Sequence, residues 1–154
     1  MLCSQMNPRI FVDNLKNACS DIDPQWQEHF DFWEGEEPGY YNEISVIVHY
    51  IVSKHKASDF RDFDDIAKII DLGLKSKNNE TSELALIGVL EGILFVGSHD
   101  DIRPEHHKNW LSEFAYKELV ELEDAFEELH EKLRNKSMQK WTFNSWLSSL
   151  RSKF

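Results

Sequence analysis

The stretch FVGSHDDIRPEHH, residues 95–107, holds three of the seven histidines of the chain beside three carboxylates. Histidine and carboxylate side chains bind metal ions and transfer protons in catalysis. One hypothesis is therefore a metal-dependent hydrolase that uses His99, Asp100, Asp101 and His106. A metal ion needs three or four such side chains converging at about 2 Å. His106 and His107 are adjacent, so on a helix they point about 100° apart and do not both reach one ion.

A second interpretation makes the same stretch a polar joint between two helices. Gly97 is placed to end one helix, and Pro104 is placed to begin the next. Glu105 would then lie at the positive end of that helix. The sequence contains no phosphate-binding loop, no GxSxG and no HExxH motif. We therefore predict a structural joint, no metal or other cofactor, and no enzymatic activity.

Two other segments interleave carboxylates with aromatic rings, DFWEGEEPGYYNE at 31–43 and ASDFRDFDD at 57–65. Aromatic anchors surrounded by acids are suited to binding an Arg- or Lys-rich surface. The other interpretation, left open, is a solvated rim over core aromatics. Together with the two aspartates of the joint, the residues predicted to contact a partner are Glu34, Glu36, Glu37, Tyr40, Tyr41, Asp59, Asp62, Asp64, Asp65, Asp100 and Asp101.

The charge of the chain is large, negative and unevenly distributed. The formal net charge is −11, and residues 1–131 hold all 28 acids against 11 bases, whereas 132–154 hold six bases and no acid. So negative a body repels nucleic-acid phosphates and attracts cationic proteins. We predict a basic protein partner and no direct nucleic-acid binding. The basic segment 132–154 is predicted to pack on the acidic body.

The elements that must position these residues are predicted to be helices throughout. Asn7 and Pro8 form a helix-start signal, and apolar residues recur with a period near 3.6 in most of the chain. The sequence predicts an all-α single domain, 1–154, of seven or eight mostly antiparallel helices. Their expected positions are 7–22, 23–33, 43–54, 62–76, 81–96, a short helix after 104, 115–136 and 142–154.

The segment Leu84–Gly97 is the longest apolar run, 14 residues interrupted by Glu91. It is shorter than the roughly 20 residues that cross a membrane, so we predict a central core helix and no membrane span. Glu91 is expected at a partly exposed edge of that helix. Gly88 and Gly92 are expected to let a neighbouring helix approach closely. The N-terminus carries no secretory signal pattern, which predicts a cytoplasmic protein.

The predicted helix 115–136 carries apolar residues at alternating spacings of four and three, from Ala115 through Leu119 and Leu122 to Leu133. This pattern is typical of a helix that packs along one face. Three heptads are too few to assign a coiled coil between chains. We therefore predict a monomer or a weak dimer.

A resemblance adds to this interpretation. The segments FWEGEEPGYYNEISVIVHYIV and DFDDIAKIIDLGLKSKNNETSELALIGVLEGIL resemble small acidic all-helical immunity proteins of bacterial contact-dependent and polymorphic toxin systems, over about residues 26–96. The resemblance implies a short HEAT-like α-solenoid element in a cytoplasmic binding protein. It also implies an inhibitor that covers the active cleft of a basic toxin. The 28 carboxylates of the chain can mimic a polyanionic substrate, so a nuclease is the expected toxin. The resemblance transfers no individual contact residue.

The sequence thus favours an immunity protein that neutralises a basic toxin domain. Two alternatives stay open beside it: the metal-dependent hydrolase built on the 99–107 loop, and a helical adaptor or regulatory protein unconnected with toxins.

Overall fold

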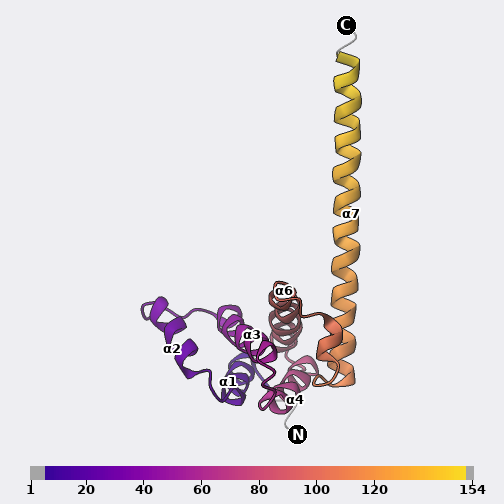
Figure 1. Cartoon of the computed structure of the whole chain (residues 1–154). Helices are drawn as coiled ribbons and strands as arrows, with labels where there is room; N and C mark the ends of the chain where they lie inside the picture. The colour runs from indigo at the N-terminus through magenta and orange to yellow at the C-terminus, as the bar shows by residue number, and fades with distance from the viewer. Residues whose placement is uncertain (1–5, 152–154) are drawn as a thin grey trace. The chain divides into compact units, whose positions relative to one another are not determined.

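The computed structural model describes the backbone of residues 6–151 and the side chains of residues 6–138. Every regular element in this range is helical, which confirms the prediction of an all-α chain (Figure 1). In chain order the elements are α1 (Pro8–Ala18), α2 (Asp23–Phe32), α3 (Tyr40–Lys56), α4 (Phe63–Leu74), α5 (Asn79–Glu83), η2 (Leu84–Glu91), α6 (Gly92–Ser98), η3 (Pro104–His107) and α7 (Glu113–Arg151).

The elements α5, η2 and α6 follow one another without a break and form one helix, Asn79–Ser98, called the central helix below. Its middle third, η2, is π-helical. With the central helix taken as one, the described range has six helices and the 3₁₀ turn η3. The finer prediction of seven or eight helices is not confirmed.

The chain divides into two compact units, Met1–Val120 and Glu121–Phe154, called the N-terminal and C-terminal units below. The boundary falls inside α7. The predicted packing of 132–154 on the acidic body stays a prediction, and the side chains after residue 138 lie outside the described residues.

The core of the N-terminal unit forms where α1, α3, α4 and the central helix pack against one another. Their apolar stripes meet there, as the 3.6-residue periodicity predicts. Asn7 caps α1 by accepting a hydrogen bond from the backbone N–H of Ile10 at 2.9 Å. The residues that are at most 1% exposed include Phe11, Leu15, Ile44, Ile47, Ile51, Phe63, Ile66, Ile70, Leu84, Leu90 and Ile93.

Two glycines of the central helix set its distance from α3, as the sequence predicts. A Cβ atom built on Gly88 would lie 3.2 Å from Cγ2 of Ile44, and one on Gly92 would lie 3.0 Å from Cγ2 of Val48.

By length and composition alone the central helix could also cross a membrane. That is weak evidence for a span, because the core helix of a globular protein meets the same criterion, and Leu84 and Ile93 are buried against neighbouring helices.

The joint after the central helix turns at Asp101, not at Gly97. The predicted end at Gly97 is wrong because α6 continues to Ser98, and Asp101 takes the left-handed conformation at φ +57°. The carbonyl of Gly97 accepts from the backbone N–H groups of Asp100 and Ile102, at 2.9 and 3.0 Å. Pro104 begins the next element as predicted, but that element is a 3₁₀ turn.

The chain ends in one helix where the sequence predicts two. α7 runs without interruption from Glu113 to Arg151, through the expected break between 136 and 142. No glycine or proline follows Pro104 in the sequence. Thr142 and Asn144 were expected to cap a new helix, but no helix-breaking residue precedes them, so the helix continues through both positions.

Candidate protein-binding groove

A groove of about 610 Å³ lies between α3 and the central helix, within the N-terminal unit. Four lining residues come from α3, six from the central helix and two from the joint that follows. None of them is a lysine or an arginine. The lining residues are Tyr41, Ser45, Val48, His49, Ile87, Gly88, Glu91, Gly92, Phe95, Val96, His99 and Asp100.

Gly88 and Gly92 line the groove where the central helix packs closely against Ile44 and Val48 of α3. The central helix presents pairs of residues to the groove every four positions, from Ile87 to Val96. Four residues exceed the 3.6 of an α-helical turn, so such a repeat drifts around an α-helix. The wider turns of the π-helical segment η2 compensate for part of that drift. π-Helical segments are rare and are frequently found at functional sites.

Large apolar side chains stand exposed along the groove. Phe95 is 68% exposed, Tyr41 is 50% exposed and Ile87 is 36% exposed. His99 packs edge-on against Phe95, with ring centroids 5.2 Å apart. Exposed apolar groups gathered at one hollow are typical of a surface that binds another molecule.

Carboxylates of the central helix surround the Tyr41 end of this groove. Partial burial raises the pKa of the Tyr41 hydroxyl, and the negative charges of Glu83, Glu80 and Glu91 raise it further. Glu91 itself is half-buried, as predicted for an acid at the edge of an apolar helix. The groove therefore combines apolar anchors with negative charge.

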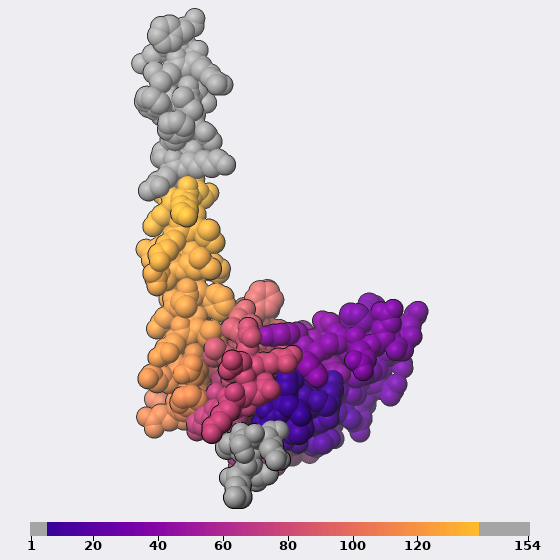
Figure 2. All heavy atoms as spheres, turned by 180° about the vertical axis from the view of Figure 1, so that it is seen from behind, coloured from indigo at the N-terminus to yellow at the C-terminus, as the bar shows by residue number. Residues whose placement is uncertain are grey.

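The first predicted acidic segment lies close by in sequence, between α2 and α3. Residues 17–53 contain eight carboxylates and no lysine or arginine. Glu34, Glu36 and Glu37 are all exposed in the turn that leads to Tyr40 and Tyr41. α2 lies at the outer edge of the N-terminal unit, and none of its side chains is fully buried (Figures 1 and 2).

Tyr40 serves the fold more than Tyr41 does. Its half-buried ring lies under the guanidinium of Arg9, which is 5.0 Å from the ring centroid. Arg9 also pairs with the buried carboxylate of Glu43 at 2.8 Å. A buried carboxylate needs such a partner, so this contact joins α1 to the first turn of α3. Of the two predicted tyrosines, Tyr41 is therefore the one available to a partner.

The second predicted acidic segment is largely engaged within the chain. Asp62 accepts hydrogen bonds from the backbone N–H and the hydroxyl of Ser20, both at 2.9 Å, and from the hydroxyl of Tyr50. Asp59 pairs with Lys54 at 3.0 Å and with Arg61 at 2.7 Å. Hydrogen bonds from Arg61, and then from Lys54, hold the pKa of Asp59 well below its usual range. These two carboxylates thus link the α3–α4 turn to neighbouring residues.

The remaining two aspartates of this segment lie in the first turn of α4. Asp64 and Asp65 are both exposed, and Asp65 forms an exposed ion pair with Lys68 at 3.1 Å. They do not line the groove.

The structure places the four residues of the hydrolase hypothesis in separate surroundings. Asp100 pairs with Lys56 at 2.8 Å, and His106 accepts from the backbone N–H of Arg103 at 3.0 Å. Asp101 occupies the turn, and His99 packs on Phe95. Within the described part of the chain, no three His, Cys, Asp or Glu side chains are placed to share a metal ion. Only Asp100 and His99 reach the groove, at its far end.

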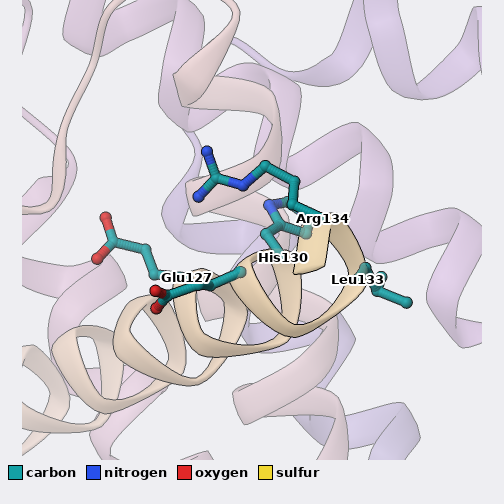
Figure 3. A pocket seen from close by; sticks show the side chains of 5 residues that line it. Glu127, His130, Leu133 and Arg134 are labelled. Atoms are coloured by element: carbon teal, nitrogen blue, oxygen red, sulfur yellow. The ribbon is translucent and has the colours of Figure 1, made fainter. Parts of the chain in front are cut away.

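A second hollow lies on the C-terminal unit, lined by Glu127, His130, Glu131, Leu133 and Arg134 (Figure 3). All five side chains come from α7 alone. A ligand there would be held by one helix, with acidic and basic groups side by side. This hollow lacks the apolar floor and the single charge sign that characterise the groove.

Of the groove residues, the sequence predicted Tyr41 and Asp100 as partner contacts and Glu91 only as a partly exposed residue of an apolar helix, and it did not predict the groove. Its other members include His49 on α3 and Ile87 and Phe95 on the central helix, and His49 and Ile87 are 38 positions apart in the sequence. The available signal was the pair of glycines at 88 and 92, which indicated a close helix but not the hollow beside it.

The fold and the groove together define a small all-α protein with an open groove lined by apolar and acidic side chains. The chain belongs to the family described as a domain of unknown function (DUF7674), whose model matches residues 12–127. The matched range contains the whole groove. No curated protein and no solved structure matches the chain.

Proposed function

We propose that the protein is a non-enzymatic immunity protein that binds a basic toxin domain through the groove between α3 and the central helix. The observation that carries this proposal is the lining of the groove. It has exposed Tyr41, Ile87 and Phe95, the carboxylate of Glu91, the carboxylate of Asp100 that pairs with Lys56, and no lysine or arginine in the lining. Such a surface is complementary to a cationic segment with apolar residues of its own.

Tyr41 and Phe95 are the anchors in this proposal. Aromatic side chains bury a large area on binding and lose little conformational freedom, so they dominate the energetics of interfaces. They insert between apolar side chains of the partner. The shallow floor over Gly88 and Gly92 accepts one projecting side chain of the partner.

The carboxylates act mainly before contact. A net charge of −11 attracts a basic domain over long range and increases the association rate. The exposed turn Glu34–Glu37 and the carboxylates around Tyr41 then orient the partner toward the groove. A nuclease binds polyanionic substrates with a cationic cleft, so an acidic protein that covers this cleft competes directly with the substrate.

The same proposal includes the finer features of the resemblance. α4 and the central helix pack against each other across the short turn 75–78, as a HEAT-like helix pair would. A toxin that acts on nucleic acid has its target in the cytoplasm, which is where the inhibitor must act. A helical adaptor would use the same groove but would have no neighbouring toxin gene.

The test is co-expression with the product of a neighbouring gene that has a basic C-terminal domain. Growth arrest by that domain should be relieved by the wild-type protein. Tyr41→Ala combined with Phe95→Ala should abolish the rescue, whereas Phe114→Ala, an exposed aromatic outside the groove, should preserve it. If the wild-type protein binds no such domain and rescues no growth, the immunity proposal is wrong and an adaptor role is favoured.

A further inference from the structure

The charges of α7 in the C-terminal unit are separated by sign along the helix. Residues 121–131 carry six carboxylates and no lysine or arginine, and residues 132–154 carry six bases and no carboxylate. The sign changes where Glu128 and Lys132 meet within the helix at 2.6 Å. A helix charged in this way is complementary to a second copy of itself that runs in the opposite direction.

The same segment has an apolar face in addition to its charges. Leu122, Phe126, Leu129 and Leu133 follow one another at spacings of four, three and four, the repeat by which helices pack side by side. Leu129 is 50% exposed and Leu133 is 54% exposed. Both leucines lie next to the point where the charge changes sign.

We propose that two copies of this chain associate by antiparallel pairing of their α7 helices from Glu121 onward. In a parallel pair, six carboxylates of one copy would lie beside six of the other, and the bases would repel in the same way. In an antiparallel pair each acidic half lies beside a basic half. The orientation is therefore selected by charge and the contact is made by the leucines.

The register follows from the position of the sign change. With the two-fold axis beside residue 131, Leu129 of one copy packs against Leu133 of the other, and Phe126 lies beside Lys136. The pairing is the same for both copies, as a symmetric dimer requires. It uses neither the groove nor its proposed partner, so it stands or falls separately from the immunity proposal.

The first experiment is sedimentation equilibrium of the full chain over a range of concentrations. A monomer–dimer equilibrium is expected, and it should shift toward monomer as salt is added, because salt screens the charged halves. Leu129→Ala combined with Leu133→Ala should give monomer, with helicity unchanged by circular dichroism. A wild-type chain that stays monomeric at every concentration overturns the proposal and favours a basic segment that folds back on its own chain.

Charge reversal provides a second, independent test. The variant Glu127→Lys/Glu128→Lys/Glu131→Lys and the variant Lys132→Glu/Arg134→Glu/Lys136→Glu should each lose self-association by at least about tenfold. All six residues are exposed, so the fold should survive both changes. The chain that carries all six substitutions should dimerise again. Failure of this combined chain to recover contradicts the charge pairing.

Disulfide crosslinking distinguishes the two orientations. The background is Cys3→Ser, because Cys19 is buried and burial raises the pKa of its thiol to about 12, which leaves it unreactive. In an antiparallel pair, two Phe126→Cys chains keep their thiols about 15 Å apart along the axis and form no disulfide. A mixture of Phe126→Cys and Lys136→Cys chains crosslinks. Crosslinking of Phe126→Cys with itself indicates a parallel pair and overturns the proposal.

Discussion

The indole N–H of Trp110 donates a hydrogen bond to Nδ1 of His107 at 3.1 Å, and both side chains are buried. Because Nδ1 accepts, the neutral imidazole must carry its proton on Nε2. Nε2 is buried and has no hydrogen-bond partner. A second proton would break the bond to Trp110 and place a charge on a side chain that is only 1% exposed. The joint between the central helix and α7 therefore depends on His107 staying neutral.

This pair predicts that the protein loses stability in mild acid. Burial, and then the charges of His55 and His106, lower the pKa of His107 to about 4, from an unfolded value near 6.5. The unfolded chain thus binds the proton more readily, and stability falls as the pH drops from about 6.5 toward 4. The expected loss from this one group is about 2 kcal/mol between pH 7 and pH 5. Urea unfolding at the two pH values measures it.

His107→Gln tests the assignment because glutamine accepts from Trp110 but does not titrate in this range. It should be less stable than wild type at pH 7 and should show a smaller loss between pH 7 and pH 5. His99→Gln, at an exposed histidine, should keep the wild-type pH dependence. An unchanged pH slope in His107→Gln would show that other groups cause the acid sensitivity.

A second prediction concerns Asp62, which the sequence assigns to the partner surface and which the structure shows bonded to Ser20 and Tyr50. Asp62→Asn removes one acceptor from this cluster and should lower the free energy of unfolding by about 1–2 kcal/mol. Asp64→Asn, at an exposed neighbour, should change it by less than about 0.5 kcal/mol. Thermal unfolding compares the two. Equal stability in both variants would leave Asp62 free for a partner role.

The glycines beneath the groove give a third prediction. Gly92→Ala places a methyl group 3.0 Å from Cγ2 of Val48, so the Val48 side chain or its helix must shift. Such overpacking costs about 1–3 kcal/mol, partly offset by the roughly 1 kcal/mol by which alanine favours a helix over glycine. The variant should therefore be destabilised or neutral. Val48→Ala in the same chain should relieve the strain, which a double-mutant cycle by urea unfolding detects as non-additivity.

The fold could be predicted from the sequence where local signals were sufficient. Asn7 and Pro8 fixed the start of α1, and the 3.6-residue periodicity identified α3, α4 and the central helix. The start of the central helix was expected at Thr81, but Asn78 is its cap and accepts from the N–H of Thr81 at 3.0 Å. Asparagine is at least as good a capping residue as threonine, so the helix begins after the earlier Asn78.

The functional surface was less predictable because it depends on contacts between distant residues. The apolar pattern of Leu84–Glu91 predicts an ordinary helix, whereas the structure has a π-helical register there. His106 is exposed, whereas the adjacent His107 is only 1% exposed. The backbone of the short turn η3 sets this difference in exposure. The structural role of Asp62 was not predicted because its hydroxyl partners, Tyr50 and Ser20, are 12 and 42 positions away in the sequence.

The last prediction separates the groove from the net charge. The groove variant, Glu83→Lys combined with Glu91→Lys, reverses two carboxylates near Tyr41. The control, Glu105→Lys combined with Glu113→Lys, makes the same change in net charge at exposed positions outside the groove lining. By stopped-flow association with the basic toxin domain at low salt, the groove variant should bind about tenfold more slowly and dissociate faster. The control should lose only part of the association rate and keep its dissociation rate, because its charges act at a distance. The difference in association rate should shrink as salt is added. Equal losses in both variants would show that the partner responds to overall charge and binds elsewhere than beside Tyr41.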